Sequence, residues 1–96
     1  MSLECDCADP ASIARTFATV AERYIAIDVL VYNAGYAQPA QDGNPMGGQL
    51  AHEIPIANFD MAYKVHVSGL LLCAQQCLPA MLARSSGAIL VTGNTM

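Results

Sequence analysis

The stretch from Ile27 to Gly35, I-D-V-L-V-Y-N-A-G, sets what this chain can fold into. Asp28 stands near its start, an apolar run rich in β-branched residues follows, and Asn-Ala-Gly ends it. Short apolar runs bounded by turn residues are typical of strands buried on both faces, as in parallel sheets. Ligands of open α/β sheets bind at the carboxyl ends of such strands, and Gly35 would let the backbone approach a ligand closely. The stretch therefore predicts a core strand over residues 28–33 and one edge of a binding site.

Segments before this strand predict a βαβ unit. Glu4–Cys7 could end a first strand. Asp9-Pro10 has the form of a helix start, with Asp as the N-cap and Pro at the first helical position. An amphipathic helix that leads into the 28–33 strand is predicted by apolar residues at helical spacing, namely Ile13, Phe17, Val20 and Tyr24. The crossover from one parallel strand to the next should be right-handed.

Segments after the strand continue the alternation. Tyr36–Gln49 is rich in glycine and proline and predicts a long loop, which either covers a ligand or is a surface insertion. A second helix, from about Pro55 to Arg84, is apolar nearly all round, which predicts burial on more than one side. Pro79 removes a backbone donor and should kink or restart this helix. Residues 88–92 then predict a third buried strand, so the expected fold class is α/β with parallel strands, in one domain over residues 1–96.

Composition narrows the classes of function. Hydrophobic residues make up 54% of the 96 residues and charged residues 12%, which predicts a core piece covered by other protein. The formal net charge of −4 gives no reason to expect nucleic acid or an anionic membrane as a partner. The apolar window 65–83 contains His66, Pro79 and two glutamines, which favours a buried helix over a membrane span.

The cysteines indicate a reduced protein without a metal site. Cysteines at 5, 7, 73 and 77 do not form a secreted disulfide framework, and residues 1–4 do not start a signal peptide, so a cytoplasmic chain is expected. Cys5 and Cys7 with His52 or His66 would make a poorly spaced zinc site. Structural thiols are the better interpretation, and we predict no metal site.

Four stretches, in order along nearly the whole chain, resemble the short-chain dehydrogenases/reductases. Asp6 followed by D-P-A-S-I looks like the segment after the family's third strand, and D-V-L-V-Y-N-A-G looks like its fourth strand and N-N-A-G turn. F-D-M-A-Y-K-V-H-V-S-G looks like the start of its long fifth helix. L-P-A-M-L-A-R-S-S-G-A-I-L-V-T-G looks like the end of that helix and the fifth strand. The resemblance implies a partial Rossmann fold, the βαβαβ middle part of a doubly wound sheet.

The resemblance also implies a reaction. Members of this family bind NAD or NADP and move a hydride between nicotinamide and a carbonyl or alcohol. The family's glycine-rich T-G-x-x-x-G-x-G turn and its Y-x-x-x-K pair occur nowhere in the 96 residues. We therefore expect the parent protein to be an NAD(P)-dependent oxidoreductase and this chain alone to be inactive, with no cofactor bound. The alternative is a non-catalytic, degenerate Rossmann module that acts in protein association.

By the same resemblance, cofactor contacts fall on Asp6, Cys7, Asn33, Ala34, Gly35 and Thr92. Asp6 would hold the adenine ring, or would only end a strand. Asn33 would face the ribose, or its side chain would tie adjacent strands together.

Two further positions are the catalytic candidates, and both depart from the family pattern. His66 stands where the family has Asn, and Asn94 where it has Ser; Tyr32 also replaces the first Asn of N-N-A-G. His66 would relay a proton or be a hydrogen-bonded core histidine. Asn94 can still donate a hydrogen bond to a substrate carbonyl.

The family's strand order, 3-2-1-4-5, has consequences for association. Its first and second strands lie between the third and the fourth and have no counterpart here. The Glu4–Cys7 strand would then have no neighbour, and the 28–33 strand would have one bare edge, which can recruit another strand. We predict self-association through that edge, through the long helix, or through both.

Overall fold

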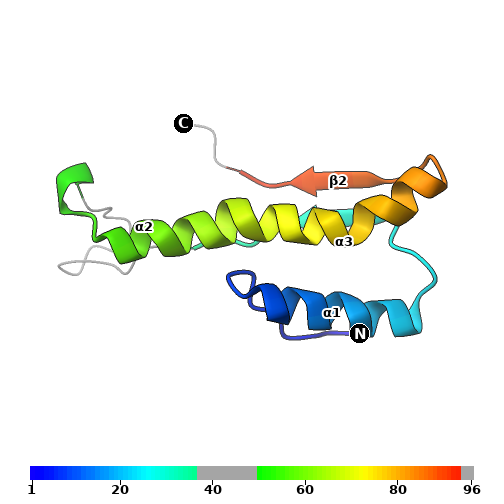
Figure 1. The fold of residues 1–96 in the computed structure, drawn as a ribbon. Coiled ribbons are helices and arrows are strands. Elements are labelled where there is room, and N and C mark those ends of the chain that lie inside the picture. The colour runs from blue at the N-terminus through cyan, green and yellow to red at the C-terminus, as the bar shows by residue number, and fades with distance from the viewer. Residues whose placement is uncertain (37–49, 94–96) are drawn as a thin grey trace.

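The computed structural model describes residues 1–36 and 50–93. Its elements, in chain order, are α1 (Pro10–Arg23), β1 (Val29–Tyr32), the 3₁₀ turn η1 (Ala51–Glu53), α2 (Ile56–Tyr63), the π-helical turn η2 (Lys64–Ser68), α3 (Gly69–Ala83) and β2 (Ala88–Val91). Figure 1 shows α2, η2 and α3 as one long helical run, with α1 alongside its second half.

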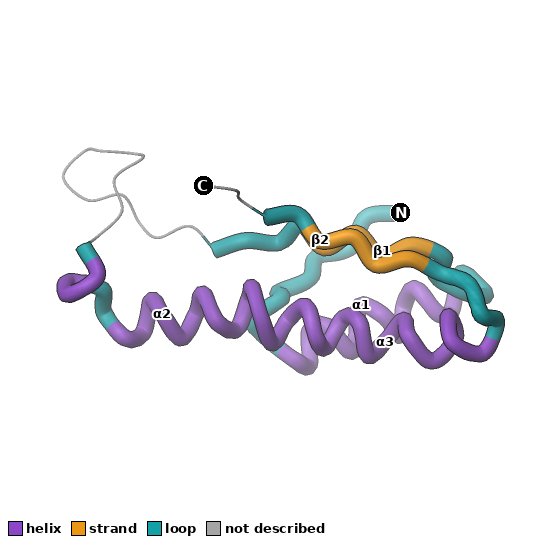
Figure 2. Tube along the Cα trace, turned by 90° about the horizontal axis from the view of Figure 1, so that it is seen from above, coloured by secondary structure: helices purple, strands orange, loops and turns teal. Residues whose placement is uncertain are grey.

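The two strands form a parallel pair with one covered face. Val29 pairs with Ala88 and Tyr32 with Val91, and Figure 2 shows α1 and α3 on the same side of both strands. Tyr32 points toward these helices and is buried, whereas Val31 on the other face is 58% exposed. The predicted α/β class and the parallel pairing of these two strands are confirmed, and residues 1–36 and 50–93 cover one face of the sheet.

The first predicted strand is not formed. Residues 1–6 have no regular secondary structure, and a turn at Cys7–Ala8 leads into α1. A strand is defined by ladder hydrogen bonds to a neighbour, and within the described residues the sheet contains only β1 and β2. The expectation of a strand ending at Glu4–Cys7 is therefore wrong for this chain, because nothing in the described part pairs with it.

Helix α1 begins as its sequence predicts. The Asp9 side chain accepts a hydrogen bond from the Ala11 N–H at 3.0 Å, and Pro10 is the first helical residue. Ile13, which is 1% exposed, then meets the buried Tyr32 and Cys73 at the centre of the core. The core thus joins α1 to the sheet and to α3.

The long helix departs from α-helical geometry at η2 and does not restart at Pro79. Helix α3 continues through Pro79 to Ala83, so of the two predicted effects, a kink or a restart, the restart is wrong. In η2 the Gly69 N–H donates to the Lys64 carbonyl, five residues back, and this π-type bond inserts one extra residue into the turn. A proline inside a helix removes one backbone hydrogen bond, and its ring clashes with the preceding turn. The helix continues here in spite of both effects.

The buried side of this helix is a single row of residues. The row consists of Val65, Gly69, Cys73, Cys77 and Met81, each four residues after the last. Outside this row the long helix carries exposed apolar side chains, among them Phe59, Tyr63, Val67, Leu71, Leu78 and Leu82. Burial on more than one side, as predicted, is therefore not met within the described residues.

By length and composition alone, the 28-residue run Ile56–Ala83 could cross a membrane. Core helices of globular proteins pass the same test. In this structure one row of its residues packs against α1 and β1.

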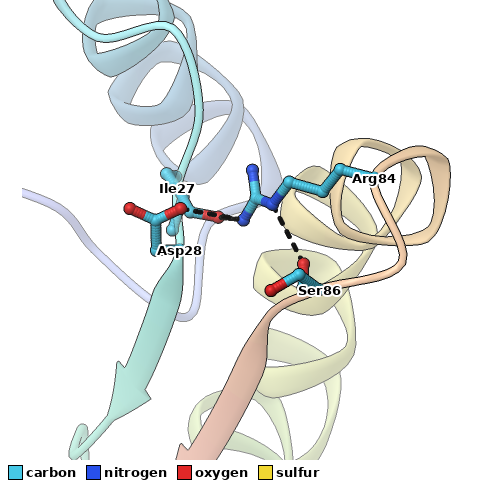
Figure 3. Close-up of polar contacts among 4 residues, drawn as sticks. All are labelled: Ile27, Asp28, Arg84 and Ser86. Atoms are coloured by element: carbon cyan, nitrogen blue, oxygen red, sulfur yellow. Dashed lines mark hydrogen bonds and ion pairs between the residues drawn. The ribbon is translucent and has the colours of Figure 1, made fainter.

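Arg84 fastens the end of α3 to the start of β1 (Figure 3). Its Nη2 donates to the Ile27 carbonyl at 2.5 Å and lies 3.3 Å from Asp28 Oδ1. Its Nε donates to the Ser86 carbonyl at 3.0 Å. One guanidinium thus joins the segment before β1 to the segment before β2, which fixes where β2 starts relative to β1.

Candidate functional site

A cavity of about 340 Å³ opens at the carboxyl ends of the two strands. Parallel strands deliver their carboxyl ends to the same edge of a sheet, and ligands of open α/β folds bind there. Five residues predicted from the sequence line it, together with Gly93: Asn33, Ala34, Gly35, His66 and Thr92. The structure thus brings most of the predicted site residues to one place.

Asn33 and Thr92 join the two strand ends across the cavity wall. The Thr92 hydroxyl donates to Asn33 Oδ1 at 2.6 Å, and the Thr92 N–H donates to the Tyr32 carbonyl at 3.1 Å. This is the strand-tying geometry, one of the two roles that the sequence left open for Asn33. The same hydrogen bond sets the orientation of the Asn33 side-chain amide, with its Oδ1 toward Thr92.

His66 lies over the turn that follows β1. Its Nε2 accepts a hydrogen bond from the Tyr36 N–H at 3.1 Å. A Cβ at Gly35 would lie 3.4 Å from His66 Cε1, so the ring sits close against that glycine. The side chain is exposed, so His66 is hydrogen-bonded but is not a core histidine.

Tyr32 makes the second contact between the end of β1 and η2, and the sequence did not predict it. Its side chain is 5% exposed, and its hydroxyl donates to the Val65 carbonyl. A Cβ at Gly69 would lie 2.6 Å from that hydroxyl, so the glycine makes room for the tyrosine. The available signal was a tyrosine in an apolar strand together with a glycine on the buried row of the helix.

Burial raises the pKa of Tyr32 and of three cysteines. Burial raises the pKa of the Tyr32 hydroxyl well above its ordinary value, and it raises the pKa of the Cys73 thiol to about 11. Burial also raises the pKa of Cys7 and of Cys77. These thiols stay protonated at neutral pH, which fits structural cysteines and not nucleophiles.

Asp6 and Cys7 do not line the cavity. Asp6 Oδ1 accepts from the Ala8 N–H at 2.9 Å, and the Asp6 N–H donates to Ser12 Oγ at 2.9 Å, so the residue shapes the turn before α1. Cys7 packs against the core that contains Tyr32. The other catalytic candidate, Asn94, and most of the predicted loop, residues 37–49, lie outside the described residues.

Outside this cavity, the described residues form a second cavity but no cluster that could hold a metal ion. Residues 1–36 and 50–93 contain no group of three or more His, Cys, Asp or Glu side chains placed to hold a metal ion. A second cavity, of about 260 Å³, lies between α1, α3 and the segment before β1, where Phe17, Tyr24 and Cys77 are among its lining. It lies at the amino end of β1, away from the predicted site residues.

Comparison with known proteins agrees with this architecture. The family model described as short chain dehydrogenase matches residues 1–95. The 2-(R)-hydroxypropyl-CoM dehydrogenase of Xanthobacter autotrophicus is 36% identical over 89 residues, which are 93% of this chain and 33% of that protein. The cis-4-hydroxycyclohexanecarboxylate dehydrogenase of Sinomonas cyclohexanicum is 33% identical over 84 residues, 88% of this chain and 30% of that protein.

Solved structures agree too. A metagenomic short-chain oxidoreductase in complex with NADP superposes with a TM-score of 0.79 at 27% identity, covering 100% of this chain and 40% of that one. A short-chain dehydrogenase from Streptomyces avermitilis gives a TM-score of 0.78 at 28% identity, covering 93% of this chain and 29% of its own. The chain spans about a third of the length of the curated relatives it matches. It belongs to the short-chain dehydrogenase family.

Proposed function

We propose that these residues form the central part of the cofactor-binding domain of an NAD(P)-dependent oxidoreductase. The observation that supports this best is the cavity at the carboxyl ends of β1 and β2, in a chain that matches the short-chain dehydrogenase family from residue 1 to 95. The reaction proposed for the parent protein is hydride transfer between nicotinamide and a carbonyl or alcohol. The relatives from Xanthobacter autotrophicus and Sinomonas cyclohexanicum are named for hydroxy compounds, which supports that substrate class.

The cavity suits one end of a nicotinamide dinucleotide. Its volume of about 340 Å³ is at the small end for ligand pockets, which typically run from about 300 to 1,000 Å³. The Ala34–Gly35 backbone lines it with little side chain in the way, and Asn33 and Thr92 supply polar groups. The cofactor supplies or accepts the hydride when bound, and the role proposed for these four residues is to hold and orient its nicotinamide–ribose end.

Asp6 and Cys7 would act at the other end of the cofactor. Asp6 is exposed, and Cys7 packs against the core around Tyr32 from outside the cavity. We propose that they contact the adenine end. The neighbour solved with NADP supports a nicotinamide cofactor in general, and the choice between NAD and NADP is left to measurement.

For the 96-residue chain alone we propose no turnover, because it contains neither the glycine-rich turn nor the Y-x-x-x-K pair. The test compares this chain with any longer reading frame that includes it, by oxidation of NADH and NADPH with a panel of ketones. The proposal would be supported if the flanking sequence contains both motifs and only the longer protein oxidises NADH or NADPH. A longer protein that has neither motif and does not oxidise either cofactor would contradict it.

Calorimetric titration of the 96-residue chain with NADH is the companion measurement. We expect weak or undetectable binding, since the cavity by itself reaches only part of a dinucleotide. Micromolar affinity would show that this chain holds the cofactor without the rest of the domain.

A second candidate function, protein association, is favoured by the exposed apolar surfaces. The open face of the sheet carries three side chains that are more than half exposed, Val29, Val31 and Leu90. On the long helix, Leu71 is exposed to the same degree. We propose that the chain self-associates through one or both surfaces, because open apolar faces and bare strand edges recruit partners.

Sedimentation velocity separates the two surfaces. Val31→Thr and Leu71→Gln form a matched pair, since the two side chains are 58% and 57% exposed and the new residues keep strand and helix propensity. The variant that shifts the chain toward monomer identifies the surface used. A folded wild-type monomer at micromolar concentration would rule out self-association.

A further inference from the structure

We propose that His66 is a positioning residue: with Tyr32, it fixes the turn after β1 against η2, and it does so with its ring proton on Nδ1. The proposal rests on the proposed function only in taking the cavity lined by Asn33, Ala34 and Gly35 as the cofactor site. In this proposal the His66 ring holds the Tyr36 backbone N–H and does not transfer a proton to a ligand.

The π-type turn creates the first attachment point. In an α-helix the Gly69 N–H would donate to the Val65 carbonyl, four residues back. Here it donates to the Lys64 carbonyl, so the Val65 carbonyl is available to the Tyr32 hydroxyl. The side chain at the end of β1 thus takes the place of a missing helical hydrogen bond.

Gly69 permits this exchange. A Cβ at this position would lie 2.6 Å from the Tyr32 hydroxyl and 2.5 Å from the Cys7 carbonyl oxygen, closer than carbon and oxygen can pack. The π-type turn, the tyrosine and the glycine therefore form one interdependent contact.

His66 creates the second attachment point, one residue further along the helix. Its Nε2 accepts from the Tyr36 N–H at 3.1 Å, and its ring lies against Gly35. Residues 65 and 66 of η2 thus hold residues 32 and 36, which stand on either side of Asn33, Ala34 and Gly35. The backbone that lines the cavity is fixed at both of its ends.

The second contact also defines the tautomer of the ring. A neutral imidazole has one donor and one acceptor nitrogen, so an accepting Nε2 places the proton on Nδ1. A proton taken up at Nε2 would break the bond to the Tyr36 N–H and release one end of the turn. Holding the turn and relaying protons through Nε2 are therefore incompatible roles.

NMR on the 96-residue chain with ¹⁵N-labelled histidine tests the wild type first. At a pH where the ring is neutral, we expect the His66 resonances of an Nδ1-protonated ring, with Nε2 in the range of an unprotonated acceptor. His52 in η1 is the internal comparison. An Nε2-protonated ring would overturn the proposal.

Amide exchange at Tyr36 tests the contact itself. His66→Phe removes the acceptor, and we expect exchange at Tyr36 to speed up by roughly fivefold, the effect of losing one ordinary hydrogen bond. His66→Gln keeps an acceptor at similar reach and should restore most of the protection, while His52→Gln should change nothing at Tyr36. Equal exchange in wild type and His66→Phe would overturn the proposal.

These measurements do not involve the cofactor. If His66→Phe fails to fold, the wild-type tautomer and the His66→Gln exchange rate still decide the matter. A wrong tautomer would remove the positioning role and leave the proposed oxidoreductase function standing. A longer protein that binds no nicotinamide cofactor would remove the function and leave the contact intact.

Discussion

Gly69 lies on the buried row of the long helix, where its missing side chain decides how closely β1 can approach. Its helical backbone would accept alanine without strain, since its conformation is that of the surrounding helix. The space beside it is taken by the Tyr32 hydroxyl and the Cys7 carbonyl. The helix and the core thus favour different residues at one position.

Gly69→Ala shows which of the two preferences, helix propensity or core packing, is stronger, because they change the free energy of unfolding in opposite directions. Helix propensity alone would stabilise the protein by about 1 kcal/mol, whereas overpacking a well-filled core typically costs about 1–3 kcal/mol. The obstacle includes a backbone oxygen 2.5 Å away, which cannot rotate aside, so we expect net destabilisation in urea unfolding. Gln75→Ala, on the exposed side of the same helix, should stay near wild type; a Gly69→Ala protein more stable than wild type would contradict the packing described here.

The buried thiols predict how stability changes with pH. Burial raises the pKa of Cys73 from an ordinary 9.0 to about 11 in the folded chain, so the folded state holds this proton more tightly than the unfolded state does. The free energy of unfolding should therefore decline as pH rises from about 9 toward 11, and be independent of this group below that range. Cys73→Ala should show a shallower decline than wild type between these pH values, and identical slopes would contradict the assignment.

At the scale of secondary structure, Arg84 decides how β2 meets β1. Its guanidinium contacts the Ile27 carbonyl, the Asp28 carboxylate and the Ser86 carbonyl from one rigid fork. Asp28 is itself largely exposed, so the ion pair adds little and the two carbonyl contacts matter more.

Arg84→Lys keeps the charge and loses the fork, because an ammonium cannot direct two fixed donors at separate carbonyls. We expect a loss of about 1.5–3 kcal/mol in the free energy of unfolding, the value of one hydrogen bond to a charged donor. Arg15→Ala, on the exposed side of α1, is the control. A lysine variant as stable as wild type would show that charge alone suffices.

Periodicity and capping predicted most of these elements, and the exceptions have physical causes. Asp9 and Pro10 start α1 because an N-cap is a local interaction. The segment at Glu4–Cys7 is not a strand, since strand formation needs a neighbour that residue types alone do not supply. The long helix departs from α-helical geometry at η2, where Tyr32, distant in sequence, donates to the freed Val65 carbonyl.

The site was predictable where it follows from topology. Asn33, Gly35 and Thr92 meet because parallel strands end at one edge of the sheet. The apolar run that ends at Gly35 predicted one edge of the site, and the family resemblance added Asn33 and Thr92. The contact of His66 with the Tyr36 N–H depends on the rotation of a helix relative to a strand, and no spacing in the sequence encodes it.

At the scale of the whole molecule, the described residues form one helical layer on a two-stranded sheet. Parallel sheets are ordinarily covered on both faces, and two strands alone give marginal stability. Here the outer face of β1 and β2 and the outer side of the long helix are exposed and apolar. This surface agrees with a chain that spans about a third of its curated relatives, and it gives the physical basis for proposing that further protein covers it.

The core, the cavity and the contact between Asn33 and Thr92 all require that β1 and β2 are parallel neighbours joined by the long helix. Nuclear Overhauser contacts between backbone protons of the 96-residue chain measure this directly. We predict contacts that pair Val29 with Ala88, Leu30 with Ile89, Val31 with Leu90 and Tyr32 with Val91, all in the parallel direction. A folded chain with antiparallel contacts between these segments, or with none, would contradict the fold and the site built on it.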